Sequence, residues 1–252
     1  MKELTDILST FEPITLKAMD RVKLLNRVDT KYVFDYNTLL KALKEIKEFY
    51  FVLEIDNKRT NSYQTLYYDT ENFDSYIKHQ NGKLNRTKIR FRKYIESDLN
   101  FLEIKFKNNK SRTLKSRIKT DDIETVLSEK STNFINDNSF LDAKSLQASL
   151  WNSFTRITLT HKTINERLTI DLDLAFKHHS TNEETGIPHI VIAELKQGKA
   201  DVSSDFVRII RKNHVRPMGM SKYCIGTALL NKQLKSNNFK ERILKINKLK
   251  TC

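Results

Sequence analysis

Basic residues at every second position of the segment KIRFRKY are the feature of this sequence most able to do chemistry. Lys88, Arg90 and Arg92 alternate with Ile89 and Phe91. Successive side chains of a β-strand point to opposite faces, so the segment predicts one cationic face and one mostly apolar face. Arginine offers bidentate hydrogen bonds to phosphate oxygens, and lysine offers a compact charge. Such a face could bind phosphate compounds, although a solvated surface strand would show the same alternation.

The same alternation recurs in further segments with strand-like patterns. Their polar faces contain Glu103, Lys105 and Lys107; Thr113, Lys115 and Arg117; Arg156, Thr158, Thr160 and Lys162; Arg167, Thr169, Asp171 and Asp173; and Glu194 and Lys196. Like charges so close together repel each other unless an anion lies among them. The short turns around residues 95–113 favour antiparallel neighbours, which would place many of these cations side by side. The pattern therefore predicts a bound polyanion.

The composition agrees with a folded protein that binds polyanions. The chain has 252 residues, of which 38% are hydrophobic, so it is long enough to bury a core. A formal net charge of +14 attracts nucleic acid, acidic lipid or phosphate compounds. With only 5 Gly and 3 Pro, the sequence has no linker-like stretch, and we expect a single domain over residues 1–252.

Neither targeting nor redox chemistry is indicated. Cys224 and Cys252 form no metal-ligand or disulfide pattern. The first residues, MKELTDILSTF, lack a basic segment followed by an apolar run, and no stretch of about 18 apolar residues occurs. We expect a soluble, cytoplasmic protein.

Short helices and many strands would have to position the cationic faces. Strands are predicted at 30–36, 50–55, 62–70, 87–95, 99–107, 111–119, 153–162, 166–176 and 189–196. Helices are predicted at 2–10, 13–24, 37–49 with Asn37 as cap, 71–79, 121–130, 203–213 and 220–247, the last broken near 236–238. A sheet closed into a barrel would turn the cations inward and leave the apolar face outside, under helices. So many buried cations require water and counter-anions. The expected fold class is α+β: an antiparallel β-barrel tunnel with a basic polar lumen, flanked by α-helices.

Eight segments in order resemble a known family. They are RVDTKYVF, TLYYDT, KIRFRKY, FLEIKFK, SRTLKSRI, RLTIDLDLAF, IAELKQ and MSKYCIG. In this order they are similar to the catalytic domain of the vacuolar transporter chaperone (VTC) polyphosphate polymerases, in the short bacterial form, over about residues 20–230. That fold belongs to the CYTH group of triphosphate tunnel metalloenzymes, so the resemblance implies an antiparallel barrel around a basic tunnel.

The resemblance also implies a role for each matching position. Catalytic positions are Arg90, Arg92, Lys105 and Arg156; substrate-binding positions are Lys31, Lys115, Arg117, Arg167 and Lys222. Glu194 matches the carboxylate that binds a divalent metal, Mn²⁺ or Mg²⁺, and Glu103 or Asp173 could assist it. The family often has another basic residue three positions before the one matched by Lys222, where this chain has Gly219. Binding of the phosphate chain at the tunnel exit near Lys222 is therefore expected to be weaker or arranged differently.

The resulting hypothesis is a metal-dependent transfer of the γ-phosphoryl group from ATP to a growing inorganic polyphosphate chain. Alternatives are a tunnel-fold triphosphatase or polyphosphatase that hydrolyses inorganic or nucleoside triphosphates, and a non-catalytic polyphosphate-binding module. A specific nucleic-acid binder is disfavoured because the basic segments lack interleaved exposed aromatic residues for base stacking.

The C-terminal segment 231–252 is strongly basic. It contains Lys232, Lys235, Lys240, Arg242, Lys245, Lys248 and Lys250 against Glu241 alone. A basic helical tail could touch anionic lipid at the inner face of a membrane, a membrane protein or the polymer. A solvated, frayed terminus is the alternative.

Overall fold

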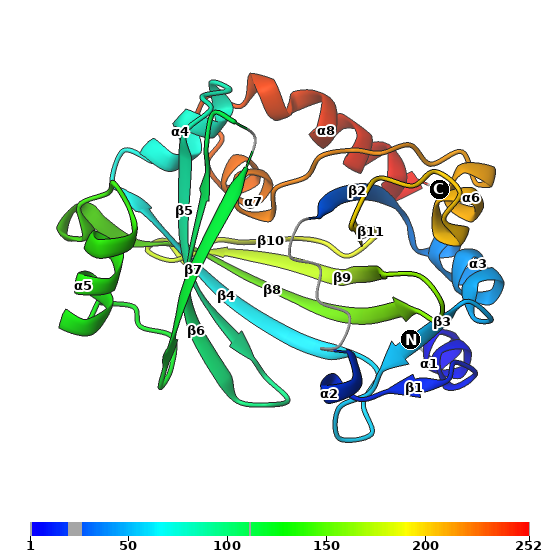
Figure 1. The fold of residues 1–252 in the computed structure, drawn as a ribbon. Helices are drawn as coiled ribbons and strands as arrows, with labels where there is room; N and C mark the ends of the chain where they lie inside the picture. Colours follow the sequence, from blue (N-terminus) through cyan, green and yellow to red (C-terminus); the bar gives the residue numbers. More distant parts are fainter. Residues whose placement is uncertain (1, 20–26, 111, 252) are drawn as a thin grey trace.

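A single curved sheet forms the centre of the fold in the computed structural model (Figure 1). The structure describes residues 2–19, 27–110 and 112–251. From edge to edge, the main path is β2 (Val28–Asp35), β11 (Ile190–Gln197), β9 (Glu166–His178), β8 (Leu146–His161), β4 (Asn61–Thr70), β5 (Arg86–Tyr94), β6 (Leu99–Lys107) and β7 (Thr113–Thr120). Every neighbouring pair on this path is antiparallel. Outside it, β3 (Tyr50–Leu53) pairs with β8, β1 (Pro13–Ile14) with β3, and β10 (Glu184–Ile187) with β9.

The helices lie around this sheet. They are α1 (Lys2–Ser9), α2 (Leu16–Met19), α3 (Tyr36–Ile46), α4 (Asp74–Gln80), α5 (Glu129–Asn138), α6 (Asp205–Lys212), α7 (Lys222–Leu230) and α8 (Asn237–Lys248), with 3-10 turns η1 (Ala143–Ser145) and η2 (Leu249–Thr251). Among the described residues, no helix is long and apolar enough to cross a membrane.

The expected fold class, an antiparallel sheet with flanking helices, is confirmed. Within the described residues, however, the sheet is curved and its hydrogen bonds do not close it into a barrel. Within the described residues, β2 and β7 are the two ends of the pairing path. After burial, the charges of Lys115 on β7 and Lys31 on β2 both lower the pKa of Lys105 in β6, so both edges lie within electrostatic reach of this side chain. Pairing the two edges would bring the cations of β7 against Lys31, and like charges on facing strands repel. The enclosed concave side is called the lumen below.

Helices cover the apolar convex face, as the alternation predicted. Helices α1, α3 and α6 pack on β2, β11, β9 and β8 in one buried cluster that includes Leu43, Ile157 and Ile170. Helix α5 packs on β4, β5 and β6 in a second cluster that includes Phe91. Figure 1 shows α5 at the left end of the molecule and the α3–α6 pair at the right end. Burying the apolar face under helices leaves the polar face of each strand for the lumen.

Helix α7 fills one part of the concave side. Its residues Tyr223, Cys224 and Ile225 are buried with Leu150 and Phe176 of the sheet, and α8 covers α7 from outside. Gly226 is the residue of α7 that permits this approach, because an added Cβ would lie 2.4 Å from the Phe176 ring. The concave side is therefore part apolar core and part polar lumen.

A β-bulge decides where the polar lumen ends. The register of β8 and β9 slips near Asp173, whose φ of 52° is left-handed. Uninterrupted alternation would place Asp173 beside Asp171, facing the lumen. The bulge instead turns Leu174 and Phe176 into the concave core and leaves Asp173 exposed. Asp173 now lies near Tyr36 on the convex side. The pKa of Tyr36 is raised first by burial and then by the Asp173 carboxylate. The prediction that Asp173 faces the lumen is wrong.

Three boundaries also differ from the sequence prediction. Asp35, not Asn37, caps α3 by accepting a hydrogen bond from the Thr38 N–H. The helix predicted at 121–130 begins only at Glu129, after Ser128, which caps it. In place of the helix predicted at 13–24, Pro13–Ile14 form strand β1 and Leu16–Met19 form α2. Residues 20–24 lie outside the described part of the chain.

Candidate functional site

Charged side chains form cross-strand rows on the concave face of β5, β6 and β7. The rows, in order along the strands, are Arg92–Phe101–Lys119, Arg90–Glu103–Arg117, Lys88–Lys105–Lys115 and Arg86–Lys107–Thr113. Directly opposed side chains in an antiparallel pair lie about 4.5–5.5 Å apart at Cβ, so each row forms one electrostatic unit. The alternation seen in the sequence and the hairpin register together produce this ladder.

The Arg90 row differs from the other rows because it contains a carboxylate, Glu103, that neutralises part of its positive charge. Two guanidinium nitrogens of Arg90 lie 2.6 and 2.7 Å from one oxygen of Glu103. Although burial alone would raise it, the charges of Arg90 and Arg92 lower the pKa of Glu103 to about 2. The Tyr67 hydroxyl lies 3.4 Å from Arg90 and accepts a further hydrogen bond. Arg90 is thus held in a fixed orientation on the lumen wall.

Arg92 is buried without a close counter-charge. Only 8% of its surface is exposed, and its nearest contact with Glu103 is 4.0 Å. Its Nε atom is buried and has no hydrogen-bond partner among the described residues. Burial, followed by repulsion from Arg90, lowers the pKa of Arg92. A buried guanidinium with an unused donor is expected to bind an anion, because leaving that donor unpaired costs free energy.

A second neutralised cluster lies on β8, β9 and α7. Asp171 accepts hydrogen bonds of 2.5 and 2.9 Å from two nitrogens of Arg156, and Lys222 at the start of α7 donates to the same carboxylate. Asp171 is only 3% exposed. Burial would raise its pKa, but Arg156 and Lys222 hold it below its usual range. Lys222 itself is desolvated, and its pKa is lowered to about 8 despite the attraction of Asp171.

Aromatic rings form cation–π contacts with Arg156 and Lys222. The rings of Tyr63 and Phe154 stack with centroids 5.0 Å apart and planes at 9°. The Arg156 guanidinium lies 4.9 Å from the Tyr63 centroid, and the Lys222 ammonium lies 4.4 Å from the Phe154 centroid. Cation–π contacts of this kind position a cation without neutralising it.

Glu194 lies between two lysines. On β11 it accepts hydrogen bonds from Lys31 of the paired strand β2 and, at 3.0 Å, from Lys196 two residues along. Its burial would raise the carboxyl pKa, but these two ammonium groups hold that pKa well below its usual range. Burial lowers the pKa of Lys196 to about 8, although Glu194 partly offsets this effect. Lys196 also donates to the Thr169 hydroxyl at 2.9 Å.

The Lys88 row has no carboxylate of its own. Lys105 and Lys115 are cross-strand partners with solvent-accessible side chains, and neither forms an ion pair within the described residues. Partial desolvation inside the lumen, followed by repulsion from Lys115 and Lys31, lowers the pKa of Lys105 to about 8. Lys88 donates to the hydroxyl of Ser221, the cap of α7, at 2.7 Å. This part of the lumen is wet and has excess positive charge.

The structure brings most of the predicted site residues together. Arg90, Arg92, Lys105, Lys115 and Arg117 share the β5–β7 ladder; Arg156, Lys222, Lys31 and Glu194 line the β8–β9–β11–β2 side. Arg167 lies on the polar face of β9, opposite Lys196, and donates to the backbone carbonyl of Met19 at 3.2 Å. Asp173 is separated from this set by the bulge.

Sequence reasoning missed several members of the site. Lys196, two residues after Glu194, was visible as alternation but was not selected. Asp171 was not among the selected site residues, because its pairing with Arg156 depends on the β8–β9 register. Phe154 lies two residues before Arg156 and therefore on the same strand face. It was not selected, although its ring lies among the lumen cations.

The donor set suits a divalent ion that is also held by phosphate. No group of three His, Cys, Asp or Glu side chains within the described residues could hold a metal by itself. Glu103 and Asp171 are bound by arginine guanidinium groups, whereas Glu194 is bound by lysines that phosphate could draw away. Mg²⁺ and Mn²⁺ accept one or two carboxylates together with water and substrate phosphate oxygens. Glu194 therefore fits as the protein ligand.

The C-terminal segment is anchored to the molecule. Phe239 and Ile246 of α8 are buried in the concave core, and the Arg242 guanidinium donates to the Gly219 carbonyl at 2.8 Å. Its lysines remain mostly on the outside. The contact with a membrane or membrane protein stays a prediction.

Comparisons with solved structures support the fold. An adenylyl cyclase candidate from Hippeastrum, described as having a dominant triphosphatase activity, aligns with a TM-score of 0.52 and 10% identity, covering 80% of this chain and 95% of its own. An adenylate cyclase candidate from Vibrio parahaemolyticus aligns with a TM-score of 0.46 and 13% identity, covering 81% and 99% of the two chains. At this level of identity, the first alignment shows a shared fold and nothing about activity. No curated protein matches the chain.

The family is established by sequence. The VTC domain family matches residues 26–231, which include every lumen residue described above. The curved antiparallel sheet, its helix-covered convex face and its polar lumen agree with the tunnel-type fold expected from the resemblance. The chain belongs to the VTC domain family.

Proposed function

We propose that this protein is a polyphosphate polymerase that transfers the γ-phosphoryl group of ATP to the end of an inorganic polyphosphate chain held in the lumen. The broader part of the proposal is a tunnel-type enzyme that acts on phosphate or triphosphate compounds, and family membership supports it. The finer part, chain extension, rests on the charges of the lumen.

The observation that carries the proposal is the buried Nε of Arg92, which has no hydrogen-bond partner among the described residues, while the contact of this side chain with Glu103 is as long as 4.0 Å. Arg90 and Arg156 on either side are already oriented by Glu103 and Asp171. Phosphate oxygens would satisfy the donor and offset both the burial and the repulsion from Arg90 that lower the pKa of Arg92. A triphosphate placed here would meet three guanidinium groups.

Transfer is favoured over hydrolysis by the state of the carboxylates. Glu103, Asp171 and Glu194 are each engaged by two cations, so none is poised to deprotonate water. The terminal oxygen of a polyphosphate is already ionised and requires no base. In the proposed step this oxygen attacks the γ-phosphorus, the bond from that phosphorus to the bridging oxygen breaks, and ADP leaves with the bridging oxygen.

Charge stabilisation would be the main contribution of the protein. Arg90, Arg92 and Arg156 would contact the transferred group, where negative charge spreads over its oxygens in the transition state. Lys105 and Lys31 would hold the acceptor chain in line with it. Glu194 would hold a divalent ion, which would supply positive charge that neutralises part of the charge on the phosphate oxygens.

A product analysis tests this proposal. The purified protein is incubated with ATP and Mn²⁺ or Mg²⁺, and the products are separated on a polyacrylamide gel stained for polyphosphate while ADP and free phosphate are measured. We expect ADP and long phosphate chains in equal phosphate equivalents. Free phosphate without chains would make the protein a triphosphatase. Binding of tripolyphosphate without any nucleotide turnover would make it a non-catalytic polyphosphate-binding module.

A further inference from the structure

Positive charge continues from the lumen onto the outer surface at one end of β5 and β6. Arg86 and Lys107 are cross-strand partners one row outward from Lys88 and Lys105. Directly opposed like charges destabilise a strand pair. Two such rows in succession, without an intervening carboxylate, therefore form an uncompensated path that leads out of the lumen.

Two further lysines lie at the end of α4 and in the turn that leads from α4 to β5. Gly82 has a left-handed φ of 70°, and the Lys83 N–H donates to the Lys78 carbonyl at 2.9 Å, so the chain reverses in a Schellman-type turn. This turn holds the backbones of Lys78 and Lys83 close together. The Asn109 N–H donates to the Asn85 side-chain oxygen at 3.0 Å and ties the β6–β7 loop to the segment before β5.

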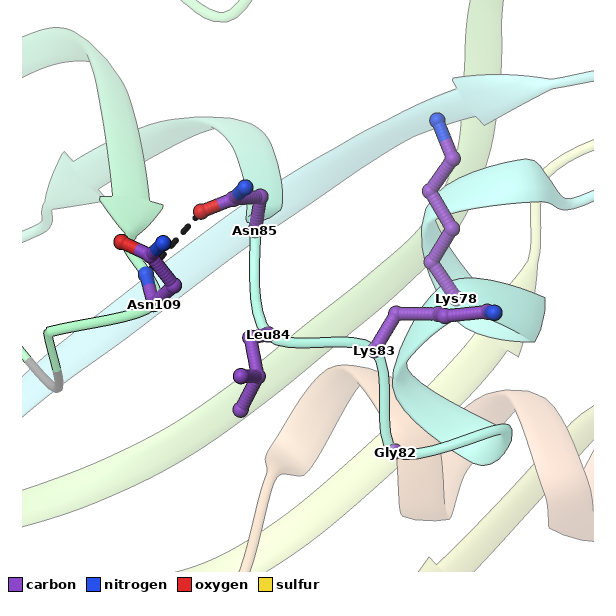
Figure 2. Close-up of a pocket in the computed structure, with 6 residues that line it drawn as sticks. All are labelled: Lys78, Gly82, Lys83, Leu84, Asn85 and Asn109. Atoms are coloured by element: carbon purple, nitrogen blue, oxygen red, sulfur yellow. Dashed lines mark hydrogen bonds between the residues drawn. The ribbon is translucent and has the colours of Figure 1, made fainter.

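These segments enclose a surface pocket. Figure 2 shows it lined by Lys78, Gly82, Lys83, Leu84, Asn85 and Asn109, with both lysines supplied by α4 and the turn after it. None of these lining residues carries a negative charge. The set Lys78, Lys83, Arg86 and Lys107 is called the basic rim below. In the part of the chain that the structure describes, no ion pair includes a member of the basic rim.

The imidazole of His79 lies near these cations and has a strongly lowered pKa. His79 of α4 lies between the basic rim and Lys88, and its Nδ1 is 2.9 Å from the Cys224 sulfur. Burial first, and then the charges of Lys88, Arg86, Arg242 and Lys107, lower the pKa of His79 to about 3. Cations of the lumen and of the basic rim, Lys88, Arg86 and Lys107, therefore act together on this imidazole.

We infer that the basic rim is a second binding site for the phosphate chain, outside the lumen, which holds the part of an inorganic polyphosphate that has left past Lys88 and Lys105. A linear polyanion fits because the cations form a continuous series from Arg92 through Lys88 to the rim. Inorganic polyphosphate is favoured over nucleic acid because the pocket presents no aromatic ring for base stacking. The inference rests on the proposed function only in taking the bound polyanion to be inorganic polyphosphate. Binding itself can be measured without catalysis.

The test compares short and long phosphate chains. Binding of tripolyphosphate and of a polyphosphate of several tens of units is measured by calorimetry, without nucleotide or metal, on the wild type and on the variant Lys78→Gln/Lys83→Gln/Lys107→Gln. We expect the tripolyphosphate affinity to change less than about twofold. The affinity for the long chain should fall at least about tenfold, and the slope of log affinity against log salt should decrease by about two for three lost cations.

A matched variant controls for net charge. Lys41, Lys130 and Lys144 are exposed lysines on α3, α5 and η1, away from the lumen. The variant Lys41→Gln/Lys130→Gln/Lys144→Gln should bind the long chain with the affinity of the wild type at physiological salt. Melting temperatures verify that both variants fold.

Four outcomes would be informative. Equal losses in the two triple variants, or no advantage of long over short chains in the wild type, would overturn the inference. Tight, rim-dependent binding of a single-stranded oligonucleotide of equal charge would replace the phosphate chain with nucleic acid and would overturn it too. Rim-dependent binding of long chains by a protein that makes no polymer would support the rim site while refuting the proposed polymerase.

Discussion

Two parts of the lumen accommodate positive charge differently: the part around Arg90 and Arg156, and the part around Lys105 and Lys115. Arg90 and Arg156 each have a carboxylate partner at 2.5–2.7 Å, so their guanidinium groups are oriented before any substrate arrives. Lys105 and Lys115 oppose each other with no carboxylate between them. The first arrangement favours a fixed geometry, and the second leaves repulsion that only an incoming anion relieves.

This difference assigns separate tasks to the two parts. Preorganised donors lower a transition-state barrier because they need no reorientation during the reaction. Uncompensated lysines give affinity for a flexible chain that must also slide, because a point charge requires no single hydrogen-bond geometry. Chemistry would therefore occur beside the arginines, and the lysines would guide the product.

The largest expected effect comes from Arg90→Lys. This change keeps the charge that neutralises Glu103 but removes the forked donor geometry, so kcat/KM for ATP should fall by about 10²–10³-fold. The affinity for tripolyphosphate should fall much less. Lys41→Arg, on the exposed face of α3, is the control. Equal losses in turnover and affinity would show that Arg90 only binds substrate.

Glu194→Gln should separate a metal ligand from an ordinary ion-pair partner. Turnover should fall by about 10²-fold or more because the divalent ion loses its carboxylate. Binding of tripolyphosphate without metal should be unchanged or tighter, because Lys31 and Lys196 lose their competing partner. Full metal-stimulated turnover in this variant would contradict the metal assignment.

The lysines should make binding depend on pH. Lys105, Lys196 and Lys222 have pKa values of about 8 in the free protein, and bound phosphate must raise them because it stabilises the charged form. Binding therefore takes up protons above about pH 8. The affinity for tripolyphosphate should fall by up to about tenfold per pH unit for each such lysine.

Calorimetry in two buffers of different ionisation enthalpy measures this proton uptake directly. Lys105→Arg should retain its charge at pH 9 and flatten the dependence. An affinity that stays constant between pH 7 and 9.5 would mean that the lysines do not contact the ligand.

The smallest effect is expected at the junction of lumen and helix. Ser221 caps α7 by accepting from the Cys224 N–H at 3.3 Å, and it also accepts from Lys88. Ser221→Ala should cost about 1 kcal/mol, which lowers Tm by about 2–4 °C in a protein of this size. Because Lys88 is then free for phosphate, saturating tripolyphosphate should restore part of the loss. A thermal melt with and without ligand makes the comparison.

Local pattern determined a large part of the fold and the site. Strand alternation alone placed Arg90, Arg92 and Lys105 on one face and their apolar neighbours on the other, because the side-chain period of a strand is two residues. The helix-covered convex face followed from the same alternation. The break before α8 was also foreseen, since a polar stretch around Ser236 interrupts the helical pattern.

Tertiary structure decided what depends on partners far away in the chain. Arg156 meets Asp171 through the β8–β9 register, and one inserted residue near Asp173 reverses the facing of every later side chain on β9. No local period encodes a register slip, because its energy comes from packing Leu174 and Phe176 against α7. Whether the sheet closes likewise depends on two edges, β2 and β7, that are distant in sequence. The sequence by itself therefore determined which residues share a face, and only the folded chain decided which opposite charges meet across it.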